Sequence, residues 1–472
     1  MLRDRYKPMD LFTLVPALSL ALEPVLAQLD RLLDDDLLFQ HVKADLRRRA
    51  PHTATRGRPS TPVEVILRML VVKRLYGWSS EETEHFVADS LVLRQFCRVY
   101  LQPVPDDTTL LRWANALGPQ TLVALNERVV ELARSLKVTC GRKLRVDSTV
   151  VETPLHHPTD SGLLADGVRG LSRLLSRAKV VMGHVTDLGQ AVFRSRLRSV
   201  RRLVRQLHRL ARRKGEGATE QLQHAYSQLI QVTQRSYAQA GKVSAALRQL
   251  GTQRAQQLVR LFEQFLPRVA RVIEQTVRRV LHGEVVPAQD KLVSLFEPHS
   301  QIIVRRKTGK AVEFGRKVWL EEVEGGLISG YRILTEAGQD FPYLPDSLVA
   351  HQQRFGHPPR LLAADRGVYS AANEAIAQQA RVKRIVIPYA GKPPPTRIAQ
   401  ERTAWFRRGW RFRAGIEGRI SVLRRRFGLG RCQAHGEAGL GRWVGWGILT
   451  ANLVTIGHRV ADRSTRSTRR AA

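Results

Sequence analysis

The apolar and polar positions of residues 1 to about 135 predict a series of helices. Thr61 and Glu64 have the spacing of a capping box, and the proline between them suits a first helical turn. Ser79 and Glu82 repeat the box after a Gly-Trp turn, so two short helices are expected to meet there. This arrangement is compatible with a helix-turn-helix that contacts DNA, although such helices more often serve only for packing.

β-branched residues mark the first predicted strand, KLRVDSTVV, at residues 143–151. Residues 163 to about 281 return to a helical pattern, which we expect to be interrupted at Pro267. In the run AVFRSRLRSVRRLVRQLHRLARR, apolar residues at spacings of three and four form one stripe, and arginines occupy most of the remainder. The run predicts a basic amphipathic helix whose charged side either is merely solvated or contacts phosphates. Its DNA-binding candidates are Arg201, Arg202 and Arg205.

After residue 290 the pattern predicts strands again. SQIIVRR precedes a hairpin in which GRKVWLEEVE and LISGYRIL flank Gly325 and Gly326. RLLAAD, SAANEAIAQQA and VKRIVIP then read as strand, helix and strand, which predicts a parallel pair with a right-handed crossover. Helices over residues 404–427 and 436–461 complete the chain, followed by a disordered basic tail at 462–472.

The charge balance indicates the kind of partner. Among 472 residues, 77 Lys and Arg stand against 42 Asp and Glu, a formal net charge of +35, while the hydrophobic fraction of 43% is that of a globular protein. A folded protein this basic is expected to bind a polyanion, and nucleic acid is the first candidate because Lys and Arg displace counterions from phosphates. An arginine-rich genome is the alternative explanation of the excess.

Cysteine spacing and hydropathy argue against other classes of protein. Cys97, Cys140 and Cys432 are far apart and form no CxxC pattern, so neither a disulfide framework nor a zinc site is expected. The charge-free run from Leu11 to Leu22 is shorter than the roughly 20 residues of a membrane span and contains a proline. We read it as a helix and expect a soluble intracellular protein.

Two aspartates lie where functional groups collect in open α/β sheets. Asp365 closes the apolar strand RLLAA, and Asp147 sits within the first predicted strand. Burying a carboxylate in such an apolar setting costs free energy unless the carboxylate is paired or bound to metal. We therefore expect a cation beside each aspartate. The alternative for each is a turn or helix-capping aspartate.

A third carboxylate, Glu417, lies in the helical segment WRFRAGIEGRISVLRRRFG, in a row with Arg413 beside the buried stripe. It is expected at the edge of the core, directed along the sheet rather than into open solvent. Gly415 and Gly418 each cost roughly 1 kcal/mol of helix propensity relative to alanine, which suggests that something approaches the backbone closely. The alternative is an ordinary Glu–Arg pair at spacing four.

Three converging carboxylates in a basic protein suggest hard divalent cations, because oxygen ligands suit Mg²⁺ or Mn²⁺. Two such ions can assist an in-line phosphodiester displacement by acting on the attacking and leaving oxygens. Of the competing acids, Asp160 is the best substitute for Asp147, whereas Glu152 lies on the opposite strand face. His156 and His157 are read as turn residues.

Together these residues resemble the DDE transposases of bacterial insertion sequences. The order Asp147 in RVDST, Asp365 in AADRG and Glu417 in its arginine-rich helix is similar to theirs. Those enzymes often carry a tyrosine, an arginine, a glutamate and a lysine, separated in turn by two, three and six residues. Here the same spacing is kept by Trp410, Arg413, Glu417 and Arg424. HHPTDSGLLADGVRGL, AVEFGRKVWLEEVEGG and DRGVYS further resemble the group named ISNCY.

The resemblance implies an α/β fold in which an RNase H-like mixed sheet is flanked by helices. The interval between Asp147 and Asp365 is longer than such a core requires, so a long helical insertion is expected within it. The expected layout is a helical N-terminal domain at 1–135 that is a candidate for DNA binding, a catalytic domain at 136–162 and 286–461, a basic helical insertion at 163–285 and the tail.

The activity implied by the resemblance is DNA cleavage at transposon ends followed by transfer of the 3′ hydroxyl to target DNA. Asp147, Asp365 and Glu417 would be the catalytic residues and ligands of two Mg²⁺ or Mn²⁺ ions, while Arg413 and Arg424 would contact phosphates. Trp410 stands where relatives have tyrosine. The partners would be double-stranded terminal repeats and target DNA, with the protein acting as at least a dimer in the bacterial cytoplasm at the nucleoid and without a membrane. The alternatives are an idle or domesticated DNA-binding derivative and a nuclease without strand transfer.

Overall fold

The computed structural model describes residues 22–49, 60–183, 190–213, 217–307, 310–336, 338 and 340–471. The chain forms two compact units, one made of Met1–Pro154 with Arg316–Ala472 and the other of Leu155–Gly315. Most of the apolar opening stretch that the sequence predicts to be helical lies outside the described residues, and the first described helix begins at Pro24.

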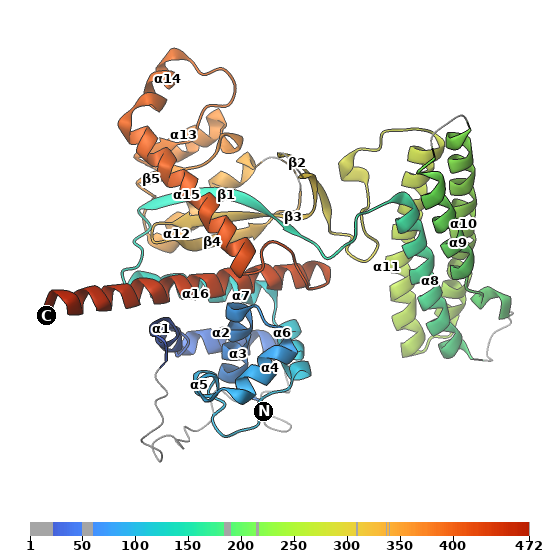
Figure 1. The fold of residues 1–472 in the computed structure, drawn as a ribbon, viewed down its shortest axis with the longest axis horizontal. Coiled ribbons are helices and arrows are strands. Elements are labelled where there is room, and N and C mark those ends of the chain that lie inside the picture. The colour runs from blue at the N-terminus through green and yellow to red at the C-terminus, as the bar shows by residue number, and fades with distance from the viewer. Residues whose placement is uncertain are drawn as a thin grey trace. The chain divides into compact units, whose positions relative to one another are not determined.

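Helices make up the N-terminal part of the first unit (Figure 1). They are α1 (Pro24–Leu32), α2 (Asp36–Arg49), α3 (Val63–Tyr76), α4 (Ser80–Asp89), α5 (Leu91–Phe96), α6 (Asp107–Ala116) and α7 (Pro119–Ser135). The capping box at Ser79 and Glu82 is confirmed, with both reciprocal hydrogen bonds formed. The box predicted at Thr61 is wrong, because Pro62 is the N-cap of α3 and none of the described side chains caps that end.

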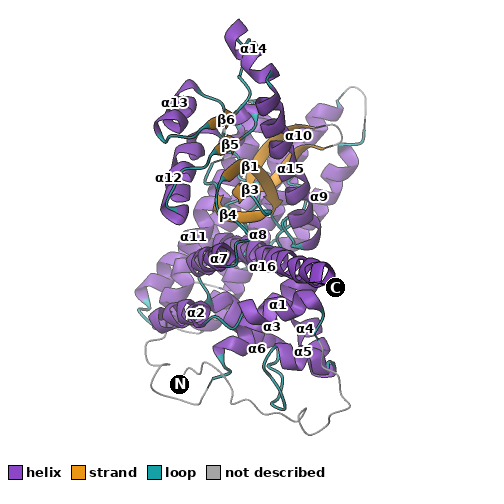
Figure 2. Cartoon of the chain, turned by 90° about the vertical axis from the view of Figure 1, so that its left-hand side faces the viewer, coloured by secondary structure: helices purple, strands orange, loops and turns teal. Residues whose placement is uncertain are grey.

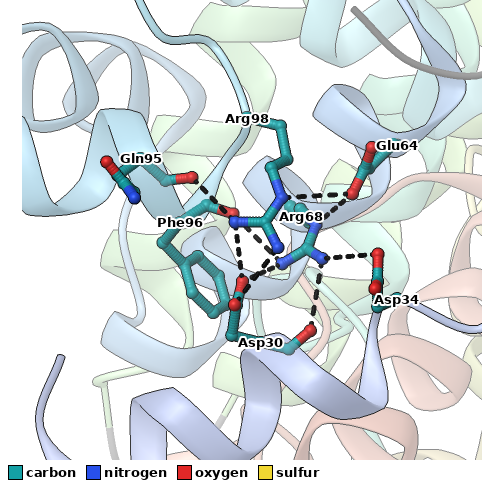
Figure 3. Close-up of polar contacts among 7 residues, drawn as sticks. All are labelled: Asp30, Asp34, Glu64, Arg68, Gln95, Phe96 and Arg98. Carbon is teal, nitrogen blue, oxygen red and sulfur yellow. Dashed lines mark hydrogen bonds and ion pairs between the residues drawn. The ribbon is translucent and has the colours of Figure 1, made fainter. Parts of the chain in front are cut away.

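Glu64 and Arg68, both on α3, are instead buried, and they form a network that joins three helices (Figure 3). Arg68 Nε donates to Glu64 Oε1 at 2.9 Å, and its Nη1 donates to Asp30 Oδ1 on α1 at 2.6 Å. The same Nη1 donates to the backbone carbonyl of Phe96 at the end of α5. Arg98 adds a second guanidinium beside Asp30. The acid that the sequence suggests as a cap therefore neutralises a buried arginine.

Six strands form one mixed sheet. They are β1 (Lys143–Glu152), β2 (Gln301–Lys307), β3 (Lys310–Val323), β4 (Leu327–Ile333), β5 (Leu361–Ala363) and β6 (Arg384–Val386). The order is β2-β3-β1-β5-β6, and β4 pairs with β3. β3 is antiparallel to β2 and β4, whereas β1, β5 and β6 run parallel. The predicted first strand, hairpin and strand–helix–strand unit are confirmed, and the fold is a mixed α/β one.

The remaining helices of the first unit pack around this sheet. They are α12 (Leu344–Phe355), α13 (Ala371–Gln379), α14 (Pro395–Arg402), α15 (Ala404–Arg426) and α16 (Gly436–Ala471). Figures 1 and 2 show α16 running between the sheet and the N-terminal helices, where it packs on α1, α3, α7 and β4. One hydrophobic core consequently includes both the N-terminal helices and the strands. α16 extends to Ala471, through residues for which the sequence predicts a disordered tail.

The second unit is a helical bundle with its own hydrophobic core. Its helices are α8 (Asp160–Met182), α9 (Leu197–Leu210), α10 (Ala218–Gln249) and α11 (Gln253–Thr276). The expected interruption at Pro267 is wrong, because α11 continues through this residue. This unit also contains the short 3-10 helices η3 (Gln190–Phe193) and η5 (Ala288–Asp290) and a π-helical turn, η4 (Val277–Leu281). Two further 3-10 helices, η6 (Phe341–Tyr343) and η7 (Arg366–Val368), belong to the first unit.

Candidate active site

Asp147 in β1 and Asp365 just after β5 occupy equivalent positions along two adjacent parallel strands. The register of β1 against β5 aligns Arg145 with Ala363, and each aspartate follows two residues later. Asp365 has left the strand and stands at the N-cap position of η7, yet its side chain makes no capping hydrogen bond. The turn and capping alternative therefore does not account for this carboxylate, and the two acids come together at one edge of the sheet.

Helix α15 brings Arg413 and Glu417 to the same place. It lies against β1, β5 and β6 and begins at an N-cap, Thr403, whose hydroxyl accepts a hydrogen bond from Phe406 N. Two glycines permit the close packing. A Cβ on Gly409 would lie 2.5 Å from Val386 of β6, and one on Gly415 would lie 2.4 Å from Arg145 of β1.

The close approach that the sequence suggests at the glycines of α15 is confirmed at Gly415, which lies under the guanidinium of Arg145. A Cβ on Gly418 would meet nothing within 4 Å among the described residues, so no part of the described chain makes such an approach there. The expected direction of Glu417 is wrong, since its side chain is 68% exposed. Glu417 faces solvent at the rim of the site because it lies on the outer side of the helix.

Arg413 connects all three candidate acids. Its Nη1 donates to Glu417 Oε1 at 2.8 Å, and its Nη2 donates to Asp147 Oδ2 at 3.1 Å. The same Nη2 lies 3.9 Å from Asp365 Oδ2. The alternative for Glu417, an ordinary pair with Arg413 at spacing four, is therefore formed. The same arginine, however, also reaches both aspartates. One guanidinium, with 11% of its side chain exposed, is shared by three carboxylates.

Desolvation alters the acidity of the innermost acid. The pKa of Asp147 is raised to about 6, chiefly by burial; the Arg413 guanidinium opposes this rise, and the nearby carboxylates of Asp365 and Asp340 contribute to it. Asp147 Oδ1 accepts one hydrogen bond, from Ser148 N at 2.8 Å. Asp365 Oδ1 is buried and has no hydrogen-bond partner within the described part of the chain. The two aspartates together therefore lack the positive charge and the donors that would fully satisfy them.

Asp340 is an acid of this region that the sequence did not single out. Ser148 Oγ donates to its Oδ2 at 2.6 Å, and Lys317 Nζ donates to its Oδ1 at 2.7 Å. It follows β4 in a segment without a strand or helix pattern, so nothing in its local sequence distinguishes it from a surface aspartate. Lys317 neutralises Asp340 and so limits its repulsion of Asp147.

Arg145 is a second residue that the sequence did not single out. Its Nε donates to Glu322 Oε2 at 2.8 Å and its Nη2 to Glu322 Oε1 at 2.5 Å, which joins β1 to β3. Its Nη1 donates to the backbone carbonyl of Phe412 on α15, and the guanidinium lies 4.7 Å from the centre of the Phe412 ring. Arg145 thus fixes the part of α15 that carries Arg413.

A hollow of about 550 Å³ opens beside Asp365. Its lining residues are Asp365, Arg366, Pro388, Glu401, Phe406, Arg407, Trp410 and Arg413. Trp410 is 38% exposed, and Arg413 Cζ lies 5.3 Å from the centre of its ring. Arg424 lies about 16 Å further along α15, from the helical rise of 1.5 Å per residue. The predicted Trp410 and Arg413 are therefore at the carboxylates, and Arg424 is displaced from them along the helix.

The described residues contain no group of three His, Cys, Asp or Glu side chains placed to hold a metal ion. Arg413 lies between Glu417 and the aspartates, which accounts for this result at the candidate site. The donors themselves are carboxylate oxygens, one of them without a partner, and this chemistry suits hard divalent cations. Of the competing acids, Asp160 pairs with Arg279 within the second unit.

Comparison with known proteins bears on the N-terminal part of the chain. Residues 19–116 match the family model described as "Transposase domain (DUF772)". This match supports a transposase family. The matched residues include α1 to α6 and end before β1, so the match does not extend to Asp147, Asp365 or Glu417.

One curated relative adds a second comparison. It is "Uncharacterized protein ORF8 in nfe locus" from Rhizobium meliloti, 28% identical over 160 residues that make up 32% of this chain and 73% of that protein. No solved structure matches the chain significantly. No helix among the described residues is long and apolar enough to cross a membrane.

Within the matched transposase domain, α3 and α4 meet at a turn, as the sequence predicts. α4 carries Glu81, Glu82, Glu84 and Asp89 but no Lys or Arg. A helix with this charge is repelled by phosphates, so α4 is unsuited to enter a DNA groove. The charge of α4 thus favours packing as the role of this helix, whereas DNA contact by the other N-terminal helices stays a prediction.

In the second unit, α9 forms the predicted basic amphipathic helix. Val200, Leu203 and Leu207 are buried, whereas Arg201, Arg202 and Arg205 are exposed. α9 has no acidic residue, and these three arginines make no ion pair with any described residue. Their charges are therefore available to an external anion such as a nucleic-acid phosphate.

Proposed function

We propose that the chain is a DNA transposase with an RNase H-like catalytic core whose Asp147, Asp365 and Glu417 hold two Mg²⁺ or Mn²⁺ ions. It cleaves phosphodiester bonds at transposon ends and transfers the resulting 3′ hydroxyl to target DNA. The observation that carries this proposal is the convergence of two aspartates from adjacent parallel strands with the helix of Glu417, in a chain whose N-terminal part matches a transposase domain.

The three carboxylates supply only oxygen donors, and the partnerless Oδ1 of Asp365 offers a free ligand position. When bound, two divalent ions would activate the attacking oxygen and stabilise the leaving one. Because the raised pKa of Asp147 reflects burial beside other acids, a cation at the site favours its ionised form and thereby its role as a ligand.

The remaining residues of the site position DNA. Arg366 and Arg407 line the hollow beside Asp365, where they can hold phosphates while Trp410 offers an exposed ring face. Arg413 and Arg424 extend this cationic row along α15, and Arg201, Arg202 and Arg205 of the second unit also bind DNA. Because two transposon ends must be processed, the protein acts as at least a dimer on DNA.

The test uses the purified full chain with duplexes carrying the ends of its own element, in Mg²⁺ or Mn²⁺. Nicking and strand transfer are followed on gels, and DNA binding is measured by fluorescence anisotropy. Asp365→Ala is expected to abolish both reactions and to leave DNA binding almost unchanged. Asp346→Ala, which removes an exposed aspartate paired with Arg332, is the matched control and should react like the wild type.

Three outcomes separate the proposal from its alternatives. Normal cleavage by Asp365→Ala would show that the site is wrong. Cleavage by the wild type without strand transfer would identify a nuclease, and DNA binding without cleavage would identify a DNA-binding derivative of a transposase.

A further inference from the structure

The candidate ion site already contains a cation that belongs to the protein. The Arg413 guanidinium donates to Asp147 and Glu417 and lies 3.9 Å from Asp365 Oδ2. A divalent ion held by the same three carboxylates would be repelled by this guanidinium and would compete with it for the same oxygens. Arg413 and the ions therefore cannot both make their best contacts with the acids.

We propose that Arg413 is an internal counter-cation that keeps the ion site closed until DNA phosphates draw its guanidinium away. This inference rests on the proposed function, because it assumes that the three carboxylates bind divalent ions. It makes ion binding and DNA binding mutually dependent. DNA then regulates the site at which it is cleaved.

The contacts of Arg413 show that its present position is incompletely stabilised. Its Nε is buried and makes no hydrogen bond to any described residue, so only the two terminal nitrogens hold it to the acids. Asp365 Oδ1 is likewise left without a partner. One guanidinium also offers a single positive charge to three acids. Because both the guanidinium and the carboxylates have polar atoms without partners, a change that supplies such partners lowers the free energy.

A second position for the guanidinium lies next to the first. Arg413 lines the hollow that also contains Arg366, Arg407 and the exposed ring of Trp410. Its Cζ is 5.3 Å from the centre of that ring, which remains a favourable cation–π partner after the carboxylates are released. A phosphate in this hollow can accept two parallel hydrogen bonds from a guanidinium, as a carboxylate does. Rotation of the side chain, without movement of α15, can therefore transfer Arg413 from the acids to DNA.

Thermodynamic linkage turns this exchange into a measurable coupling. If DNA binding removes Arg413 from the acids, DNA must increase the affinity for ions, and ions must increase the affinity for DNA by the same factor. Replacing Arg413 by an uncharged residue must remove this coupling and leave the ion site permanently open. The loss of a charged hydrogen-bonded partner predicts an ion affinity at least about tenfold higher in the variant.

The experiment measures Mn²⁺ binding to the full chain by isothermal titration calorimetry and by the paramagnetic resonance signal of free Mn²⁺. Arg413→Gln is expected to bind Mn²⁺ about tenfold or more tightly than the wild type in the absence of DNA. A duplex of arbitrary sequence should strengthen Mn²⁺ binding by the wild type and should not strengthen binding by Arg413→Gln. The same titration of Asp365→Asn with the duplex measures the Mn²⁺ that DNA binds by itself, and this amount is subtracted.

Arg411→Gln is the matched control, because Arg411 is an exposed arginine on the same helix and should retain wild-type Mn²⁺ binding with and without DNA. Thermal unfolding of each variant confirms that it is folded, and Mn²⁺ should raise the melting temperature of Arg413→Gln more than that of the wild type. If Arg413→Gln and the wild type bind Mn²⁺ equally at a site that Asp365→Asn removes, the inference fails and the proposed function stands. If neither binds Mn²⁺ through Asp365, with or without DNA, the proposed function fails as well.

Discussion

Arg413 of α15 donates a hydrogen bond to Asp147 of β1 across a sequence separation of 266 residues. The bond links the helix that carries Glu417 to the strand that carries the first aspartate. It also places a positive charge where the sequence predicts metal ions. The charges of the site can therefore be tested by substitutions at the aspartates and in α15.

The raised pKa of Asp147 predicts a pH-dependent contribution to stability. An aspartate has an ordinary pKa of 3.8, and burial is the main cause that raises the pKa of Asp147 to about 6 in the folded chain, so the folded state holds a proton that the unfolded state releases. The stabilisation is fully present below about pH 4 and is lost as the pH rises through about 6, by at most about 3 kcal/mol.

Asp147→Asn cannot titrate and should lack this loss. Urea unfolding of the wild type and of Asp147→Asn, compared from about pH 4 to pH 7, is expected to show the wild type losing stability relative to the variant as the pH rises. Asp346→Asn, at an exposed aspartate, should follow the wild type throughout. A constant difference between the wild type and Asp147→Asn would contradict the raised pKa.

Two glycines of α15 should respond in opposite directions to alanine. A Cβ at position 415 collides with the Arg145 guanidinium, so Gly415→Ala is expected to destabilise the chain by about 1 to 3 kcal/mol and to reduce DNA cleavage. Gly418→Ala meets open space within the described structure and should stabilise by up to about 1 kcal/mol through helix propensity. Denaturant unfolding measures both; equal effects at the two positions would show that Arg145 does not hold α15.

Arg68 is expected to be essential for the N-terminal helices. Arg68→Ala leaves Glu64 buried beside a cavity and should cost about 3 to 5 kcal/mol, because one partner of a buried ion pair is removed. The double variant Glu64→Gln with Arg68→Met removes both charges and should recover much of that loss. Urea unfolding provides the measurement, and a double variant as unstable as Arg68→Ala would show that the ion pair is not responsible.

The exposed face of α9 should contribute non-specific DNA affinity. Replacing Arg201, Arg202 and Arg205 by alanine is expected to weaken binding to all duplexes alike, and to reduce the slope of log affinity against log salt by up to about 2.7, at about 0.9 for each phosphate contact. Arg248→Ala, whose guanidinium is already paired with Glu263, is the control and should change the slope little. Fluorescence anisotropy across a salt series decides this, and an unchanged slope in the triple variant would exclude α9 from the interface.

Much of the fold could be predicted from local patterns. β-branched residues identify β1, the Gly325-Gly326 turn identifies the hairpin of β3 and β4, and the order of strand, helix and strand identifies β5, α13 and β6. The capping box at Ser79 and the amphipathic helix α9 are predictable too, since capping and periodicity depend on residues within one or two turns. The Thr61 box failed because Glu64 is used by a buried arginine rather than by the helix end.

The sequence by itself determined which acids were candidates for the site, because Asp147 and Asp365 lie in or after apolar strands and Glu417 lies in a helix of arginines. Tertiary structure alone decided that Arg413 is shared among them, that Asp340 lies nearby and that Gly415 rather than Gly418 has a packing role. The physical reason is that strand register and helix periodicity fix the direction of a side chain along its own element, whereas its neighbours come from segments hundreds of residues away.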